Sequence, residues 1–201
     1  MSPAKAPYHH GDLGAALVHA AMELLEESSE ADLSLRAVAR RAGVSPAAPY
    51  RHYADREALV SAVAAVGYQE LAQRLAAAHP APSTPDQLAS VAVAYVEFAL
   101  ERPALFRIMF TEPCDRDNDA RVAATLAVSQ YVHAIVERAF PEADTEALAT
   151  AIWALVHGLA LLHLDRKLDA PSPAVVAQRI TAAVHALLTA TNLGPDTADG
   201  R

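Results

Sequence analysis

The sequence predicts an all-α protein in which a three-helix helix-turn-helix unit precedes a helical bundle. Alanine is abundant among the 201 residues, whereas glycine occurs only seven times, and this balance favours helix. Between the prolines, apolar residues recur at spacings of three and four, which is the period of amphipathic helices. No segment alternates for longer than a few residues, so a β-sandwich or a β-barrel is not expected.

Prolines divide the chain into segments that we interpret as about nine helices. Pro80, Pro82 and Pro85 make the clearest break between an N-terminal and a C-terminal part. The expected helices cover residues 11–28, 34–41, 46–52, 56–78, 85–101, 103–111, 117–139, 143–166 and 173–191. These spans give a helix-turn-helix domain over 1–56, a connecting helix over 57–80, a bundle over 81–193 and a disordered tail over 194–201.

Charge is distributed unevenly along the chain, although its net value is −8. Residues 33–56 carry a single acid, Asp55, and their cations are Arg36, Arg40, Arg41, Arg51 and Arg56. A short basic window of this kind can place a cationic face on a phosphate backbone. By charge alone, however, a solvated helix face is the simpler interpretation.

One segment, residues 147–164, carries no formal charge over 18 residues, which is the lower limit for crossing a bilayer. Much of it is alanine, and it contains His157 and Gly158, which weaken its preference for lipid. A helix that is apolar all round is equally what a buried core or a subunit interface requires. The N-terminus lacks an unbroken apolar signal sequence, and a single Cys suits a reducing compartment. We therefore expect a soluble, cytoplasmic protein without a membrane partner.

Residues 34–53, SLRAVARRAGVSPAAPYRHY, have the pattern of two short helices around a tight turn. Ser34 is a candidate N-cap, and Gly43 lies where a helix can end in the left-handed conformation. Ser45 is a second candidate N-cap, with Pro46 at the first helical position. This pattern indicates a helix-turn-helix, which presents its second helix to the major groove of DNA.

The second helix of this unit combines phosphate-binding side chains with a bare surface. Tyr50 and His52 can donate hydrogen bonds to phosphate, whereas Tyr53 is more typical of a core aromatic. The start of the helix offers no side-chain hydrogen bond, because it consists of Pro46, Ala47, Ala48 and Pro49. Pro49 also cannot donate to the Ser45 carbonyl, so we expect this turn to be distorted. DNA shape is then expected to supply much of the sequence preference, with Arg36 able to reach a guanine edge.

The N-terminal third of the chain resembles the DNA-binding domain of TetR-type transcriptional regulators. The strings that carry this resemblance are YHHGDL and SLRAVARRAGVSPAAPYRHYADREALVSAV. A later string, WALVHGLA with Trp153, His157 and Gly158, resembles the Trp-His-Gly ligand-domain variant of that family. The resemblance implies a homodimeric repressor that binds a palindromic operator and is released by a small-molecule inducer. It also implies that residues 81–193 form a ligand-binding and dimerisation domain.

The resemblance also assigns DNA contacts by position. Ser34 and Arg36 fall at the start of the helix that crosses the backbone, and Arg56 replaces the family's usual Lys while keeping the charge. The full set of DNA-binding candidates is Ser34, Arg36, Ser45, Ala47, Ala48, Tyr50, His52 and Arg56.

The C-terminal part offers candidates for an inducer pocket and for a dimer interface. An apolar pocket would draw on Tyr95, Phe98, Phe106, Met109, Phe110, Trp153 and His157, although each of these is also a plausible core residue. No buried cluster of Lys or Arg indicates an anionic ligand, so the inducer is expected to be apolar. Two long helices from each subunit can form a four-helix interface through Ile152, Leu155, Leu159, Leu162, Val176, Ile180, Val184 and Leu187.

Catalytic and metal-binding interpretations find little support in the sequence. The nine His residues contain no pair at helical spacing for zinc, and there is no Gly-rich phosphate loop or Ser nucleophile elbow. We expect no enzymatic activity, no cofactor and no metal. The alternative to a regulator is a helical ligand-binding or protein-interaction module with weak or no specific DNA binding, which the acidic balance and the bare second helix favour.

Overall fold

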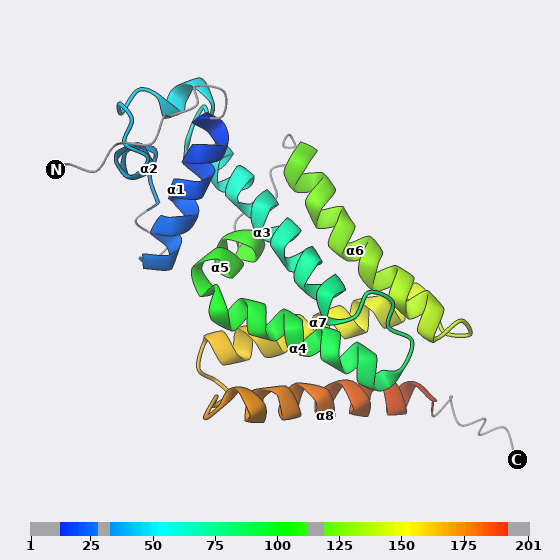
Figure 1. Cartoon of the computed structure of the whole chain (residues 1–201). Coiled ribbons are helices and arrows are strands. Elements are labelled where there is room, and N and C mark those ends of the chain that lie inside the picture. Colours follow the sequence, from blue (N-terminus) through cyan, green and yellow to red (C-terminus); the bar gives the residue numbers. More distant parts are fainter. Residues whose placement is uncertain (1–12, 28–32, 112–118, 193–201) are drawn as a thin grey trace, which may run out of the picture. The chain divides into compact units, whose positions relative to one another are not determined.

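The computed structural model describes residues 13–27, 33–111 and 119–192, and within these ranges its regular elements are helices joined by turns and loops, without a strand (Figure 1). This confirms the predicted all-α class. The α-helices are α1 (Leu13–Glu27), α2 (Leu35–Arg41), α3 (Arg56–Ala78), α4 (Pro85–Glu101), α5 (Pro103–Thr111), α6 (Asp119–Ala139), α7 (Thr145–Leu164) and α8 (Pro173–Asn192), with a 3₁₀ helix, η2 (Pro49–Arg51), between α2 and α3. The predicted tail over 194–201 lies outside the described residues.

The chain forms two compact units. The first comprises Met1–Gly67 with Ala104–Val122, and the second comprises Tyr68–Pro103 with Ala123–Arg201. The division therefore cuts α3 between Gly67 and Tyr68 and groups α5 with the helix-turn-helix. The domain boundaries expected at residues 56 and 80 lie on either side of this division. The roles expected for these domains stay a prediction.

Local capping defines α2 as the sequence predicted, whereas the second predicted cap, Ser45, caps no helix, because η2 begins at Pro49 without a side-chain cap. The Ser34 hydroxyl accepts a hydrogen bond from the Ala37 amide at 3.2 Å and caps α2. Gly43 has a φ of 70°, so the chain leaves α2 through the left-handed conformation that glycine tolerates. The Asp55 carboxylate accepts from the Ala58 amide at 2.9 Å at the start of α3.

The predicted α-helix over residues 46–52 is wrong. Residues 46–48 form a turn, and only Pro49–Arg51 are helical, in the tighter 3₁₀ form. Pro49 has no N–H to donate to the Ser45 carbonyl, and that carbonyl instead accepts from the Ala48 amide at 3.0 Å. The missing α-helical bond therefore leaves a segment wound at about three residues per turn.

Close packing at Gly67 joins α5 to α3 within the first unit. A Cβ at Gly67 would lie 2.7 Å from the Met109 sulfur and 3.0 Å from Leu105 Cδ1. Both of these α5 side chains are almost fully buried. The absence of a side chain at Gly67 thus allows the two helices to approach closely.

In the second unit, α4 packs against both α7 and α8 (Figure 1). Thr84 begins α4 with a capping box, in which its hydroxyl accepts from the Gln87 amide and the Gln87 side chain accepts from the Thr84 amide. The core of this unit comes mainly from these three helices and includes Val96, Phe98, Ile152, Val156, Ile180, Val184 and Leu188.

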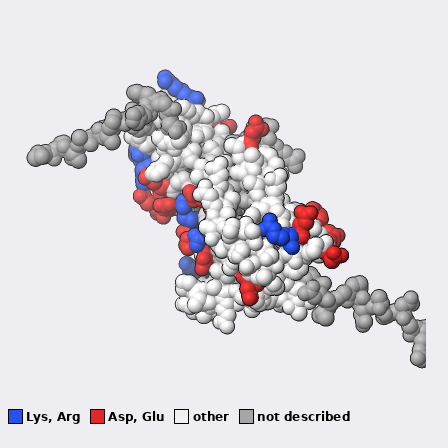
Figure 2. Space-filling view, turned by 45° about the vertical axis from the view of Figure 1, so that its right-hand side comes forward, with Lys and Arg blue, Asp and Glu red and all other residues white. Residues whose placement is uncertain are grey.

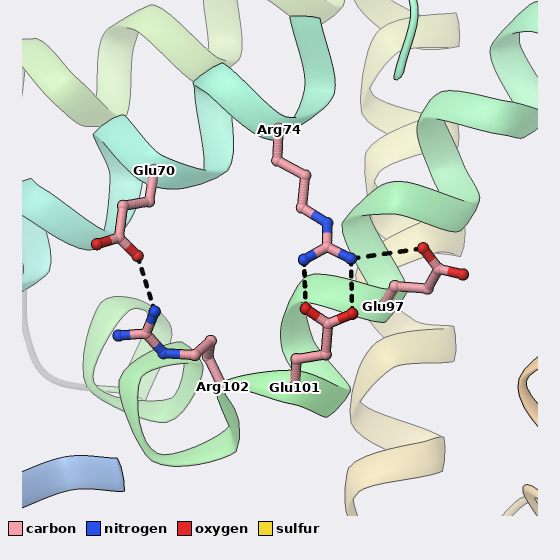
Figure 3. A network of polar contacts seen from close by, with 5 residues as sticks. All are labelled: Glu70, Arg74, Glu97, Glu101 and Arg102. Carbon is pink, nitrogen blue, oxygen red and sulfur yellow. Dashed lines mark hydrogen bonds and ion pairs between the residues drawn. The ribbon is translucent and has the colours of Figure 1, made fainter. Parts of the chain in front are cut away.

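A network of ion pairs joins the C-terminal half of α3 to α4 (Figure 3). Arg74 makes a bidentate pair with Glu101, in which Nη2 lies 2.7 Å from Oε1, and it also contacts Glu97. Arg102, at the end of α4, donates to Glu70 of α3 at 3.1 Å, so in this pair the arginine comes from the α4 side and the carboxylate from α3. The hydrogen bond to Glu101 raises the pKa of Arg74 and lowers the pKa of Glu101. These partly exposed pairs fix the register of the two helices more than they add stability.

Helix α7 is long and apolar enough to span a membrane by length and composition, yet a core helix of a soluble protein passes the same test. Only 33% of its most apolar window is buried inside the chain. Trp153 and Leu162 are 48% and 42% exposed. Helix α7 therefore presents a broad apolar face that the described part of its own chain does not cover.

Candidate nucleic-acid interface

The segment after α2 exposes two of the predicted phosphate-binding side chains. Tyr50 is 55% exposed, and His52 is exposed as well. Tyr53 instead donates from its hydroxyl to the Gly14 carbonyl at 3.1 Å and so fixes this segment to the first turn of α1. A Cβ at Gly14 would lie 3.5 Å from His52 Nδ1, which places the imidazole beside the same turn. A tight anchor therefore holds Tyr50 and His52 at the surface.

Helix α2 contributes a cap and two cations. Ser34 uses its hydroxyl on the Ala37 amide, so its side chain orders the helix start. Arg36 and Arg40 are four residues apart, lie on one face of α2 and are exposed. Neither makes a hydrogen bond or an ion pair with any residue in the described ranges. They are available to an anion such as phosphate.

Two further arginines near this surface, Arg41 and Arg56, have structural partners. Arg41 donates from Nη1 to Glu27 at 2.9 Å and also contacts Glu23, and the Glu27 hydrogen bond raises the pKa of Arg41. Arg56 donates from Nε to the Leu33 carbonyl at 3.0 Å. Arg56 therefore helps to hold the entry to α2, and its phosphate-binding role stays a prediction.

The first residues of the helix predicted over 46–52 carry no polar side chain and are partly buried. Ser45 and Ala47 are exposed, Ala48 is half-buried and Pro49 is buried. Arg51, which follows them on η2, is exposed and was not among the residues predicted to contact DNA. The basic composition of residues 33–56 was the signal that could have identified it.

Charge on the visible face of the molecule does not form one continuous basic surface. Figure 2 shows Lys and Arg there in separate small groups, several of them beside Asp or Glu, with wide uncharged areas between. An interface with DNA would therefore depend on a few individual cations, as expected for a chain of net charge −8.

The predicted pocket residues fall into two groups that belong to different units. In the second unit, the Tyr95 hydroxyl lies 2.9 Å from His157 Nδ1, and the Trp153 and His157 rings have centroids 6.0 Å apart. The Trp153 side chain also hydrogen-bonds Tyr95. Burial raises the pKa of Tyr95 and lowers that of His157, so both are neutral near pH 7.

The remaining predicted pocket residues are packed within their own units. Phe106 and Phe110 of α5 lie in the first unit with ring centroids 4.7 Å apart, and Met109 packs at Gly67. Phe98 of α4 is 3% exposed in the second unit. Tyr95, Trp153 and His157 thus lie together in the second unit, whereas the predicted pocket residues of α5 belong to the first unit.

Most of the predicted dimer-interface residues are buried inside a single chain. These are Ile152, Leu159, Val176, Ile180 and Val184, none of them more than 9% exposed. A partner subunit cannot reach such side chains, because they pack in the core that α4, α7 and α8 share. Leu162 is exposed, and Leu155 and Leu187 are half-buried.

An all-helical chain with a helix-turn-helix that exposes Tyr50 and His52 is typical of DNA-binding transcriptional regulators. Residues 17–63 match the family model described as bacterial regulatory proteins, tetR family. Residues 88–190 match the model described as Tetracyclin repressor-like, C-terminal domain, and this region contains Trp153, His157 and Gly158. The chain therefore belongs to the TetR family of bacterial regulatory proteins.

Solved structures agree with this assignment. A protein with unknown function from Rhodococcus sp. RHA1 shares 34% identity over 92% of this chain and 98% of its own, with a TM-score of 0.77. A tetR-family regulatory protein from Rhodococcus RHA1 shares 23% identity over 88% and 97% of the two chains, with a TM-score of 0.64. The TetR family regulator PfmR from Thermus thermophilus shares 17% identity over 87% and 94%, with a TM-score of 0.62. The last two show similarity of fold alone.

Proposed function

We propose that the protein is a cytoplasmic transcriptional repressor that binds a palindromic operator as a homodimer and is released by a small apolar inducer. The observation that carries this proposal is the surface formed by α2 and η2. Beside the Ser34 cap of α2 it exposes Tyr50, His52 and two α2 arginines that have no ion-pair partner among the described residues. The α2 helix would cross the DNA backbone while the following segment enters the major groove.

Dimerisation is supported by the uncovered face of α7. Ala147, Ala151, Ala154 and Gly158 follow one another at three- and four-residue spacing along this face, and none of them is buried. A Cβ at Gly158 would meet nothing within 4 Å among the described residues. Small residues allow a partner helix to approach closely, and a second copy would cover the exposed Trp153 and Leu162 at its edges. A palindromic operator would require the recognition segments of the two subunits to lie about 34–36 Å apart, one turn of DNA.

Inducer binding is supported by the cluster of Tyr95, Trp153 and His157. Its rings are apolar, while the Tyr95 hydroxyl links the indole to the imidazole through hydrogen bonds. An apolar surface with a few oriented polar groups is typical of small-molecule sites. Because Trp153 is the single tryptophan of the chain, its fluorescence reports directly on this cluster. We expect an inducer to change Trp153 emission at the same concentration that releases DNA.

Selection of bound duplexes from random DNA tests the proposal. The native protein is run beside a Tyr50→Ala, His52→Ala double variant and a control, Gln130→Ala, which changes an exposed side chain of α6. We expect the native protein and the control to enrich the same palindrome. Loss of two phosphate hydrogen bonds should weaken the double variant by roughly 10- to 100-fold. A folded, dimeric native protein that enriches no duplex at low salt would contradict the proposal.

The alternative, a helical module without specific DNA binding, is favoured by the bare residues 46–49 and by the acidic net charge. A salt titration separates the two functions. Contacts to phosphate make the logarithm of the affinity fall linearly with the logarithm of the salt concentration. An affinity for duplex DNA that is immeasurable at every salt concentration would favour the module.

A further inference from the structure

We propose that Arg51 reads a guanine in the major groove of each operator half-site and supplies most of the base-specific selection. This inference rests on the proposed function and adds to it the residue and the base that determine specificity. It depends on the winding of residues 45–51, on the chemistry of the neighbouring side chains and on the surroundings of Arg51 within the described chain.

The tight winding of residues 45–51 leaves the Arg51 side chain exposed. The Ala48 amide donates to the Ser45 carbonyl at 3.0 Å, and the Arg51 amide donates to the Ala48 carbonyl at 3.3 Å. The 3₁₀ helix itself covers only Pro49–Arg51, and within it Pro49 is buried whereas Arg51 is exposed. Ser45 and Ala48, which precede it, have small side chains, so Arg51 carries the longest side chain among these three residues.

The neighbours of Arg51 cannot replace it as a reader of bases. Residues 46–49 carry no side-chain hydrogen-bonding group. The Tyr50 hydroxyl and the His52 ring can each donate only one hydrogen bond to a given group, which suits a phosphate oxygen. Arginine instead presents a planar fork of donors that matches the O6 and N7 acceptors of guanine.

Arg51 also differs from the other arginines of the unit in what surrounds it. Across the described residues it makes no hydrogen bond and no ion pair through its side chain, whereas Arg41 is held by Glu27 and Arg56 by the Leu33 carbonyl. Arg36 and Arg40 share its freedom within the described chain but lie on α2, the helix that crosses the backbone. On that helix they suit phosphate oxygens, with Arg36 also able to reach a guanine edge, whereas Arg51 lies on the segment that we propose enters the groove.

The test compares Arg51→Ala and Arg51→Lys with a matched control, Arg40→Ala, in the full-length protein. Each is first taken through duplex selection, and its affinity is then measured for the selected operator and for the same duplex with one G·C pair replaced by A·T. We expect the native protein to discriminate between the two duplexes by about 5- to 150-fold, the value of one bidentate contact. Arg51→Ala should abolish this discrimination and leave the other positions of the site unchanged. Arg51→Lys keeps the charge but not the fork, and should lose most of it.

Arg40→Ala is expected to weaken both duplexes equally and to retain the guanine preference. Equal weakening of both duplexes by Arg51→Ala would show a phosphate contact and overturn the inference, as would a native palindrome without a constant guanine. If Arg51→Ala fails to fold, as judged by its thermal melt, Arg51→Lys decides between the same two outcomes. A native protein that selects no palindrome would instead contradict the proposed function itself.

Discussion

At the scale of single residues, the sequence identified the positions whose role is local. Ser34 and Gly43 were predicted as a cap and a helix end because each acts on the backbone within a few residues of itself. Residues whose role depends on tertiary packing were not predicted. His163 is one such case, since its burial arises only when α7 packs in the folded chain. The left-handed conformation of Arg166, at the end of α7, was not predicted either.

Arg166 has a φ of 55°, in the left-handed region that glycine occupies without strain. It follows α7, and the next two amides, of Lys167 and Leu168, both donate to the Leu162 carbonyl. We expect Arg166→Gly to raise the free energy of unfolding by up to about 1 kcal/mol, because it removes the Cβ clash. Lys167→Gly is the control and should lower stability. Urea denaturation of the three proteins measures this, and a loss of stability in Arg166→Gly would contradict it.

His163 is 4% exposed in the core of the second unit, and neither ring nitrogen has a hydrogen-bond partner among the described residues. Burial lowers its pKa, the charge of Arg179 lowers it further, and Asp169 opposes this. The unfolded chain therefore binds a proton near pH 6.5 more readily than the folded chain. The free energy of unfolding should fall as the pH drops below about 6.5.

Replacement of His163 by leucine removes both unpartnered nitrogens while keeping an apolar side chain of similar size. We expect His163→Leu to raise the free energy of unfolding by about 1–3 kcal/mol at pH 7. It should also make stability less dependent on pH between about pH 5 and 7. Denaturation curves across this range check both effects, and an unchanged pH profile would show that His163 does not contribute to it.

At the scale of elements, the prolines and the apolar period predicted most helices within a few residues of their observed ends. Over residues 46–52 the sequence predicted a distortion at Pro49, but not that the lost backbone donor would reduce the α-helix to a turn and a short 3₁₀ helix. The grouping of α5 with the first unit was also not predicted. It depends on close packing between Gly67 and Met109, two residues that are 42 positions apart in the sequence.

The approach of α5 to α3 gives a prediction at this scale. Gly67→Val should place methyl groups where Met109 and Leu105 now lie and cost about 1–3 kcal/mol of stability. Adding Met109→Ala should recover part of this loss, because the flexible side chain is removed from the contact. Thermal melts of the single and double variants test the coupling. Strictly additive losses would show that the two positions do not interact.

At the scale of the whole molecule, the sequence predicted the class of protein, whereas most of the residues it nominated for a dimer interface are buried inside one chain. Five of the eight nominated residues are apolar at helical spacing because they form the core of one chain. Periodicity identifies an apolar face but not whether a neighbouring helix or a second subunit covers it. The uncovered face of α7, with its alanines and Gly158, becomes visible only in the folded chain.

Gly158→Leu tests this face. In the single chain the new side chain has open space around it among the described residues, so the fold should persist and the helix should gain intrinsic propensity. Between two subunits the same side chain would separate the helices. We expect sedimentation to show a monomer with a native circular dichroism spectrum and weak binding to palindromic DNA. A variant that remains dimeric would place the interface elsewhere.

Pro46 and Pro49, in the segment between α2 and α3, have a thermodynamic consequence for DNA binding. Their rings hold φ near about −65° at Pro46 and Pro49, and Tyr53 ties the end of the segment to α1. A segment that is already ordered before it meets its partner loses little conformational entropy on association. Binding by this regulator should therefore resemble the docking of a rigid surface, with a small change in heat capacity compared with segments that fold on DNA.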